Sequence, residues 1–449
     1  MVAVQRAFKF ALDPTPTQLE RLSRYAGASR MAYNFALGLK GQTHQQWRSL
    51  VDELIAAGLE EKEAHRRVQI KTPTKPTVQK IFNQLRGGPG EGPGGLAPWH
   101  HEVATWCFQS AWMDADQAWK NWLDSLTGKR AGHKVGYPRF KKKNRSRDSF
   151  RLHHDVREPT LRLESYRRLN LGKFGVVRLH ESGKRMHRLV SSGAAVVKSV
   201  TVSRSGSRWY ASVQCEIQTE RPAPTRRQRV NGRVGMDVGV HYLAALSQPI
   251  QDYVLIDNPR HLSRASKRLA RAQRALSRTQ KGSMRRRKAA ARVGKLHQEV
   301  AQQRATTLHW LSKRLATTFA CVAIEDLNVA GMTRSARGTV EEPGSNVAAK
   351  AGLNSSILDA APAELRRQLE YKTSWYGSQL AVLDRWFPSS KTCSACGWQN
   401  PNQTLADRVF SCAECGLRLD RDLNAARNIA AHAEVVSASG TGTPGRGGP

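Results

Sequence analysis

Two pairs of cysteines near the C-terminus constrain the fold of this 449-residue chain more than any other feature. Each pair has the spacing Cys-x-x-Cys, fifteen residues separate the pairs, and a glycine (Gly397 or Gly416) follows each one. Four thiolates at this spacing complete a tetrahedral shell, which predicts one structural Zn²⁺ without an open coordination position. Two disulfides are the alternative, which the lack of secretory features disfavours. The predicted zinc ligands are Cys393, Cys396, Cys412 and Cys415.

The charge of the chain predicts a polyanionic partner. Lysine and arginine number 72 against 36 acidic residues, which gives a net charge of +36. Nucleic acid is favoured over a membrane surface, because no apolar run approaches the ~18 residues of a spanning helix. The N-terminal stretch also lacks the unbroken apolar core of a signal peptide, so we expect a cytoplasmic protein.

Basic residues are concentrated in one stretch, residues 260–304, which holds fifteen of them and a single acid, Glu299. A solvated helix face is the ordinary interpretation, but charge this one-sided would repel itself without an anionic partner. A second basic run is "RFKKKNRSR", Arg139 to Arg147. The predicted nucleic-acid contacts are Arg139, Lys141, Lys142, Lys143, Arg271, Arg274, Arg278, Arg285, Arg286 and Arg287.

The first third of the chain is predicted to be mainly helical. Residues 3–12 alternate like a strand, and a capping box begun by Thr15 then predicts a helix to about Gly41. A second helix is expected over residues 101–126, with a tryptophan stripe that faces the core rather than nucleic-acid bases. The glycine- and proline-rich stretch 86–98 between these helices predicts a surface loop.

Strand patterns begin near Val135. They comprise "KVGYPRFKKK", "LNLGKFGVVRLHE" and a hairpin, "VTVSRSGSRWYASVQCEI", with its turn near Ser205 and Gly206. The strand at residues 3–12 has no partner nearby in sequence, so we expect it to join this sheet, with the helices as an insertion. The basic stretch "RPAPTRRQR" that follows is predicted to be a linker.

The last third of the chain predicts an α/β domain. A buried strand in "RVGMDVGVHYLAALS" precedes a long helix from Pro259 to about Leu315, and "FACVAIEDL" forms a second strand. The stretch "TRSARGTVEEPGSNVAAKAG" predicts a flexible lid or loop, and the tail "SASGTGTPGRGGP" is expected to be disordered.

Three acids stand at the ends of elements in this region. Asp237 shares a strand face with Gly235 and Gly239, which would leave the acid open to a metal ion or a nucleic-acid backbone. Glu325 ends an apolar strand, and Asp422 begins an alanine-rich helix. The alternative for Asp237 is an acid at a strand-end turn, and for Glu325 it is an acid in a solvated turn. For Asp422 the alternative is a helix cap. Together, three carboxylates could hold two Mg²⁺ ions for phosphodiester hydrolysis.

These stretches resemble the TnpB (OrfB-type) proteins of bacterial insertion sequences, a family related to miniature type V CRISPR effectors. The matching stretches occur in the family's order and span most of residues 3–430. They are "RMAYNFAL", "VGYPRFKKK", "GMDVGV", "AIEDLNVAGM", "CSACG", "CAECG" and "DRDLNAARNIA".

The resemblance implies an RNA-guided DNA endonuclease. Such an enzyme binds a guide RNA made from the transposon end, recognises a short motif beside its double-stranded DNA target, and cleaves the DNA in a Mg²⁺-dependent RuvC site. Carried over by position, the nuclease triad falls on Asp237, Glu325 and Asp422, with Asp420 as a neighbour.

The resemblance also implies a multidomain α+β fold. A helical recognition lobe is inserted in a β-barrel wedge domain, and an RNase H-like (RuvC) α/β nuclease domain with a zinc-ribbon insert follows. The implied division is 1–14 for the first wedge strand, 15–126 for the recognition lobe, 127–230 for the wedge barrel, 231–392 for the nuclease domain, 393–418 for the zinc ribbon, 419–435 for the C-terminal part of the nuclease domain, and 436–449 for the disordered tail.

Three alternatives stay open at the level of sequence. A miniature type V CRISPR effector would share these features and take its guide from a repeat array. A strand-transferring transposase would use the carboxylates for transesterification. An RNA-guided binder or repressor would bind DNA without cutting it, although the three carboxylates favour cleavage.

Overall fold

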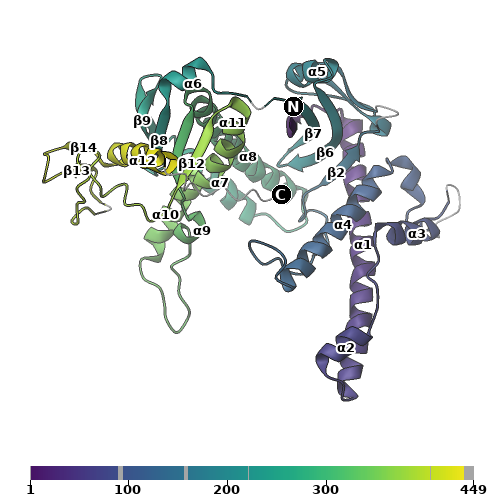
Figure 1. The fold of residues 1–449 in the computed structure, drawn as a ribbon. Coiled ribbons are helices and arrows are strands. Elements are labelled where there is room, and N and C mark those ends of the chain that lie inside the picture. The colour runs from purple at the N-terminus through teal and green to yellow at the C-terminus, as the bar shows by residue number, and fades with distance from the viewer. Residues whose placement is uncertain (1, 89–94, 156–159, 221, 405, 439–449) are drawn as a thin grey trace. The chain divides into compact units, whose positions relative to one another are not determined.

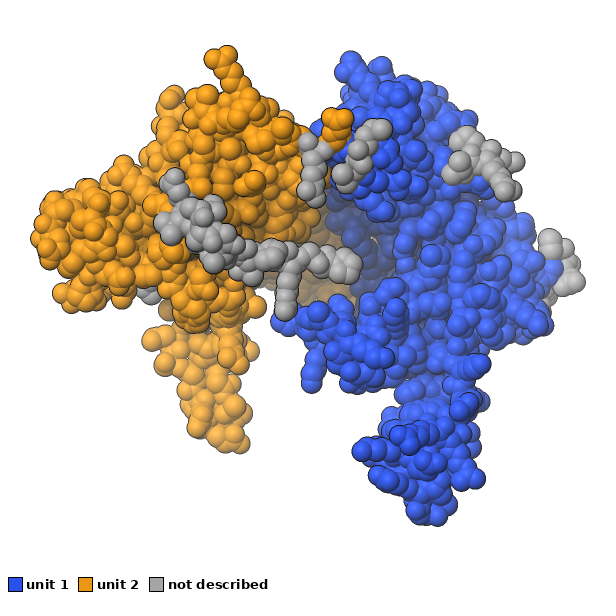
Figure 2. Space-filling view, viewed as in Figure 1, with its two compact units in different colours: residues 1–219 blue, residues 220–449 orange. Residues whose placement is uncertain are grey.

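The computed structural model describes residues 2–88, 95–155, 160–220, 222–404 and 406–438. The chain divides into two units at Thr219 and Glu220, which Figure 2 colours separately. No helix in the described part of the chain is long and apolar enough to cross a membrane. Residues 439–449 of the predicted disordered tail lie outside the described residues, as do positions 89–94 of the predicted loop at 86–98. The first part of that tail, residues 436–438, is instead the end of a helix.

The first unit is built on a four-stranded antiparallel sheet of order β1-β7-β6-β2. Strand β1 (Val2–Ala11) pairs along its whole length with β7 (Arg208–Thr219), which forms a hairpin with β6 (Ala195–Ser205). Strand β2 (Ser149–His153) completes the sheet. The predictions of the hairpin, and of a first strand that joins it across an inserted helical segment, are therefore confirmed.

The inserted segment is helical, with boundaries that differ from those predicted. Thr15 caps α1 through the expected capping box, but α1 continues past Gly41. A Cβ at Gly41 would lie 3.1 Å from the Tyr137 hydroxyl, so this glycine admits a neighbour instead of ending the helix. The helices are α1 (Pro16–Ala56), α2 (Glu61–Arg67), α3 (Lys75–Leu85), the 3₁₀ helix η1 (Pro98–Glu102) and α4 (Trp106–Leu126).

The tryptophan stripe of α4 faces the core, as predicted, since Trp112, Trp119 and Trp122 are all buried. The helix begins at Trp106 and not at residue 101, because η1 occupies the preceding turn. On α1, Tyr25 packs against Phe150 of β2 and Phe174, with ring centroids 5.2 and 5.3 Å apart respectively. The helices and the sheet of this unit thus share one hydrophobic core.

The strand predicted in "KVGYPRFKKK" is absent: residues 134–143 have no regular secondary structure. Pro138 lacks an amide hydrogen for a ladder, and the Asn34 side chain binds the backbone of Lys141 instead. The next predicted strand, "LNLGKFGVVRLHE", is interrupted by a 3₁₀ turn and forms part of a small second sheet. The remaining elements of the unit are β3 (Leu161–Ser165), β4 (Arg168–Leu171), η2 (Gly172–Phe174), β5 (Val176–Arg178) and α5 (Lys184–Ser191).

The second unit contains a five-stranded mixed sheet of order β10-β9-β8-β11-β12. Strands β9, β8 and β12 of this sheet are labelled in Figure 1. Strand β8 runs parallel to β11, which runs parallel to β12, whereas β9 and β10 are antiparallel additions. The bounds are β8 (Arg233–Asp237), β9 (Tyr242–Ile250), β10 (Tyr253–Asp257), β11 (Cys321–Glu325) and β12 (Gln379–Leu383).

Helices cover both faces of this sheet. Val234, Met236, Val322 and Ile324 pack with leucines of α8 (Met284–Thr318) and α11 (Pro362–Tyr376). On the opposite face, Ala323 packs with Ile429 of α12 (Arg421–Ala438). Strand alternation therefore sends the odd-numbered side chains of β8 and β11 toward α12.

Three predictions for this unit needed correction. The helix expected from Pro259 to Leu315 is two helices, α7 (His261–Ser277) and α8, separated by a turn in which Gly282 has φ 89°. The end of the expected linker forms α6 (Arg226–Asn231). The end of the expected lid forms α10 (Val347–Ala360), after the short helix α9 (Val329–Met332).

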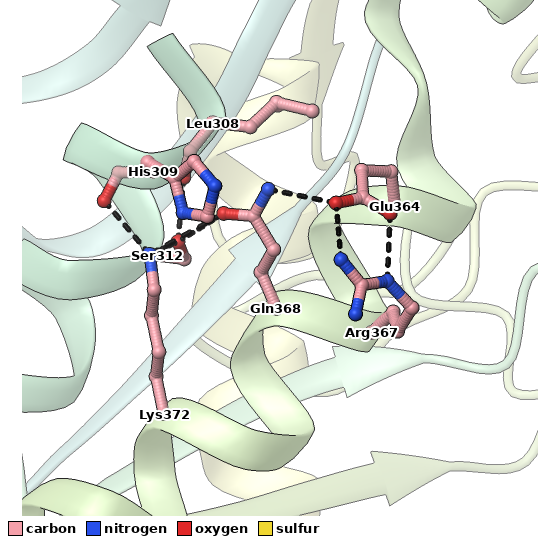
Figure 3. A network of polar contacts seen from close by, with 7 residues as sticks. All are labelled: Leu308, His309, Ser312, Glu364, Arg367, Gln368 and Lys372. Carbon is pink, nitrogen blue, oxygen red and sulfur yellow. Dashed lines mark hydrogen bonds and ion pairs between the residues drawn. The ribbon is translucent and has the colours of Figure 1, made fainter. Parts of the chain in front are cut away.

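A polar network joins α8 to α11 (Figure 3), and its members Ser312, Gln368 and Lys372 are buried. The Lys372 ammonium donates to the Ser312 hydroxyl at 2.6 Å and to the His309 carbonyl at 2.9 Å. Gln368 accepts from Ser312 at 2.9 Å and donates to Glu364 at 2.9 Å, and Arg367 also binds Glu364. Burial lowers the pKa of Lys372 to about 8. This network holds α11 against α8, and Arg366 of α11 binds Asp326 in the loop after Glu325.

Candidate active site

Asp237 and Glu325 lie at the carboxyl ends of neighbouring parallel strands. The register of β8 with β11 pairs Met236 with Ile324, and each carboxylate residue comes next in its strand. Because both residues have odd numbers in strands whose odd-numbered side chains face α12, their side chains point to the same face of the sheet. The prediction that Glu325 ends an apolar strand agrees with this arrangement.

Helix α12 brings the third carboxylate to this face because Gly235 lets it approach closely. A Cβ at Gly235 would lie 2.1 Å from the Ala426 carbonyl oxygen and 2.5 Å from the Ala430 amide nitrogen. Gly235 therefore admits a helix rather than a metal ion or nucleic acid, which corrects the sequence-based interpretation. A Cβ at Gly239 would lie 4.0 Å from Asp422 Oδ2, so Gly239 does lie beside the carboxylate cluster.

The two acids at the start of α12 have separate roles. Asp420 is the cap: its Oδ1 accepts hydrogen bonds from the backbone amides of Asp422 at 2.9 Å and Leu423 at 3.1 Å. The Asp422 side chain makes no such bond; it is largely buried and accepts from the Arg421 guanidinium at 3.1 Å. The helix-cap alternative for Asp422 is therefore wrong, since Asp420 caps α12.

The Glu325 carboxylate is held by a hydroxyl from a distant segment. Ser389 Oγ donates to Glu325 Oε1. The adjacent acid, Asp326, is bound instead by Arg366 of α11 and by Arg385. Hydrogen bonds from these two arginines lower the pKa of Asp326, so it is a structural ion pair beside the cluster.

Two of the three carboxylates have raised pKa values in the cation-free protein. Burial, followed by the charges of Glu325 and Asp422, raises the pKa of Asp237 to about 8, although Arg421 opposes the shift. Burial also raises the pKa of Glu325, opposed by the bond from Ser389. Converging carboxylates with raised pKa values are typical of a site completed by cations.

The donor set fits divalent cations of the Mg²⁺ type, which prefer carboxylate oxygens. Among the described residues, only the four cysteines form a group of three or more potential ligands whose atoms all lie within 4.8 Å of one another. The carboxylates are more widely spaced than that.

We predict that Asp237→Asn raises the thermal stability of the cation-free protein at pH 8. The raised pKa means that folded wild-type protein binds a proton that the unfolded chain releases near pH 4, so wild-type stability falls as the pH rises from about 4 to about 8. The asparagine variant has no carboxyl at this position, so its stability does not fall for this reason. Unfolding midpoints should coincide near pH 4 and separate by several degrees at pH 8, in Mg²⁺-free buffer that retains zinc. Equal midpoints at pH 8 would contradict the raised pKa.

The four cysteines form a zinc-ribbon-like cluster. The sulfur atoms of Cys393 and Cys415 lie 3.6 Å apart, and those of Cys396 and Cys412 lie 3.5 Å apart. Tetrahedral Zn²⁺ with bonds of about 2.3 Å places sulfurs about 3.8 Å apart, and all four cysteines are free, so the disulfide alternative is excluded. Each knuckle turns at a glycine of positive φ, Gly397 or Gly416. Strands β13 (Val409–Ser411) and β14 (Arg418–Asp420) flank the second knuckle.

Three bacterial relatives, each named "Putative RNA-guided DNA endonuclease", match nearly the whole chain. The protein from Mycobacterium tuberculosis is 37% identical over 97% of this chain and 88% of its own length. The Escherichia coli protein is 33% identical over 97% of this chain and 94% of its own length. The Streptomyces pristinaespiralis protein is 34% identical over 98% of this chain and 92% of its own length. The chain belongs to the TnpB family.

Three family models match parts of this TnpB chain. "Probable transposase" (OrfB_IS605) covers residues 212–336, and "Cas12f1-like, TNB domain" covers 363–429, which includes the cysteine cluster. "Helix-turn-helix domain" covers residues 1–48, where the structure has β1 and the single helix α1. A solved Cas12f1–sgRNA–target DNA complex is 13% identical, with a TM-score of 0.47 over 95% of this chain and 99% of its own.

The predicted nucleic-acid contacts of this TnpB chain fall into two groups. Arg286 caps the C-terminus of α7 through the carbonyls of Leu276 and Thr279, and Lys141 lies 3.9 Å over the Tyr33 ring, so both side chains have structural partners. The remaining eight are exposed: Arg139, Lys142, Lys143, Arg271, Arg274, Arg278, Arg285 and Arg287.

Sequence-based reasoning missed the residues of this TnpB chain that hold the carboxylates. Ser389 lies in an irregular segment before Cys393, and Arg421 stands beside Asp422. Neither belongs to a periodic pattern. The nearest signal for Ser389 was its position four residues before the zinc ligand Cys393.

Proposed function

We propose that this chain is an RNA-guided DNA endonuclease that binds a guide RNA, recognises a short target-adjacent motif and cleaves double-stranded DNA in a RuvC-type site. The observation that carries the proposal is the convergence of Asp237, Glu325 and Asp422 on one face of a sheet. The shared name of the relatives supports RNA guidance and DNA as the substrate. We place this activity in the bacterial cytoplasm, on DNA when a target is bound.

We assign residues 231–392 and 419–435 to an RNase H-like nuclease domain, with residues 393–418 as its zinc-ribbon insert. This assignment is supported by the strand order, in which β8 is central, β11 and β12 are parallel to it, and β9 and β10 are antiparallel additions. Residues 15–126 would be the recognition lobe. The two sheets of the first unit, with boundaries at 1–14 and 127–230, would be the β-barrel wedge.

The three carboxylates would hold two Mg²⁺ ions, which supply an activated water and charge stabilisation at the leaving oxygen. The chain's own residues prepare this site. Ser389 orients Glu325 and Arg421 orients Asp422, while Asp237 has to release a proton when a cation is bound. Zn²⁺ at the four cysteines would have no catalytic role, because its coordination shell is complete.

Base pairing with the guide would determine the target sequence, while exposed basic side chains hold nucleic-acid backbones. Helices α7 and α8 carry the densest group, and they pack as a pair joined by the ion pair of Arg268 with Glu299. Arg271, Arg274 and Arg278 of the α7 end are exposed and lie in the same short stretch of chain. We propose this helical pair as a guide-RNA or heteroduplex contact.

We predict that a triple alanine variant at Arg271, Arg274 and Arg278 binds guide RNA more weakly and with less salt dependence. Each lost phosphate contact should lower the slope of log affinity against log salt by about 0.7 to 0.9. The matched control replaces three uncharged, exposed residues of the same helix, Ser263, Ser266 and Gln273. An unchanged salt slope in the arginine variant, measured by filter binding, would remove α7 from the interface.

Sequencing the RNA that co-purifies with the protein tests the proposal, when the gene is expressed with its native flanking DNA. A discrete RNA ending in sequence from beyond the element is expected. An RNA derived from a repeat array would instead support a miniature CRISPR effector, a class to which the "Cas12f1-like, TNB domain" match also relates the chain. Heterogeneous RNA alone would contradict a dedicated guide and would bring the strand-transfer alternative forward.

A further inference from the structure

The segment between β12 and the zinc knuckle, residues 387–394, contacts both the carboxylate cluster and α12; we call it the strap. It contains Ser389 near its start and Cys393, the first zinc ligand, near its end. Its turn is closed by bonds from the amide and hydroxyl of Thr392 to the Pro388 carbonyl at 3.1 and 2.8 Å. The strap therefore has a defined shape and is not a loose connection.

Ser389 is the strap's contact with the cluster. Only 5% of this residue is exposed, and its hydroxyl donates to Glu325 Oε1. A buried hydroxyl in this place restricts the rotation of the carboxylate and leaves its other oxygen available to a cation. Partners of this kind orient ligands and typically contribute about 10- to 100-fold to metal affinity.

Two buried asparagines of α12 hold the strap in place. Asn428 Nδ2 donates to the carbonyls of Ser389 at 2.7 Å and Thr392 at 2.6 Å. Asn424 Nδ2 donates to the Thr392 carbonyl at 2.7 Å, and its Oδ1 accepts from the Ser394 amide at 2.9 Å. Because Ser394 lies between two zinc ligands, Asn424 connects the knuckle directly to the catalytic helix.

Helix α12 thus presents two stripes with different partners. Asp422, Ala426 and Ala433 face the sheet, whereas Asn424, Asn428 and His432 face the strap at intervals of one helical turn. The His432 ring stacks on Phe387 with centroids 4.1 Å apart and an angle of 11° between the planes. One rigid helix therefore contacts the carboxylate cluster and the zinc knuckle at the same time.

We propose that the strap transmits the folded state of the zinc ribbon to the cation site, with Ser389 as a positioning residue for Glu325 and Asn424 and Asn428 as its anchors. The inference rests on the proposed nuclease function and adds a structural dependence of the cation site on the ribbon. When the zinc knuckle is closed, Ser394 and Thr392 are held by their hydrogen bonds to Asn424. The strap is then held in place, and Ser389 stays in contact with Glu325.

Mn²⁺ binding to the full-length protein, titrated by electron paramagnetic resonance, tests the role of Ser389. Ser389→Ala should weaken binding about 10-fold or more, and Ser389→Thr, which restores a hydroxyl, should recover most of the loss. Ser394→Ala is the matched control, since Ser394 bonds to Asn424 through its backbone amide and should bind Mn²⁺ like wild type. Wild-type affinity in Ser389→Ala would overturn the proposal.

Asn428→Ala tests the anchor while all four cysteines remain. The variant should keep one zinc per chain and weaken Mn²⁺ binding to a similar extent as Ser389→Ala. The double variant should lose little more than either single one, because both changes release the same strap. Independent, additive losses would contradict transmission through the strap.

The proposed function and the strap fail in different ways. Wild-type protein that binds Mn²⁺ but cuts no guided target would refute the nuclease, while a loss in Ser389→Ala would still support the strap. Guided cleavage at wild-type rate and cation dependence by Ser389→Ala would refute the strap and leave the nuclease intact.

Discussion

Asp237→Ala is expected to reduce guided DNA cleavage at least about 100-fold while guide and target affinities stay within about twofold. The carboxylate lies at the centre of the cluster, where its pKa responds to both Glu325 and Asp422. Its removal eliminates a cation ligand without removing a phosphate contact. Single-turnover cleavage at saturating protein–RNA complex measures the effect, and retained cutting would refute the assignment of the site.

The two acids of α12 provide a matched control for this prediction. Asp422→Asn should show a loss comparable to that of Asp237→Ala. Asp420→Asn should cleave nearly as well as wild type, because asparagine also caps helices and Asp420 binds only backbone amides. The reverse result would transfer the ligand role to Asp420.

Cys393→Ser is expected to abolish zinc binding and unfold the ribbon. Structural zinc contributes about 10 kcal/mol or more to the folding of small zinc domains, far more than the small apolar core around Phe410 can replace. The variant should lose its zinc by elemental analysis and become sensitive to proteolysis between residues 393 and 418. Cys321→Ser, at a cysteine of β11 outside the cluster, should retain one zinc per chain. Protease resistance of the zinc-free variant would contradict a metal-dependent ribbon.

Local chemistry made part of this structure predictable. The zinc knuckles follow from cysteine spacing and glycine placement alone, and the first helix follows from the Thr15 capping box. The strand carrying Glu325 follows from its apolar run. In each case the determining residues lie close together in the sequence.

Tertiary contacts decided the features that were predicted wrongly. Gly41 suggested a helix end but accommodates Tyr137, and Gly235 suggested an open acid but accommodates α12. The basic run gave no hint that Gly282 breaks it into two packed helices. A glycine in the sequence shows where space is needed, but not which neighbour fills it.

The site was predictable only in outline for the same reason. Asp237, Glu325 and Asp422 each follow a recognisable pattern, whereas Ser389 and Asn428 act through contacts with residues 64 and 39 positions away. Only the folded chain brings them to the cluster. The cap role of Asp420, two residues from Asp422, depended on side-chain direction at a helix start, which spacing alone does not determine.

Reprogrammed cleavage is the decisive test of whether this protein cuts DNA under the direction of its guide RNA. The protein is assembled with its co-purified RNA, the guide portion of that RNA is replaced by a new sequence, and a plasmid carrying both the old and the new targets beside the same motif is incubated with Mg²⁺. If the protein is an RNA-guided nuclease, cutting moves to the new target and is absent in Asp237→Ala. Cutting that ignores the guide, or joined strand-transfer products, would contradict it.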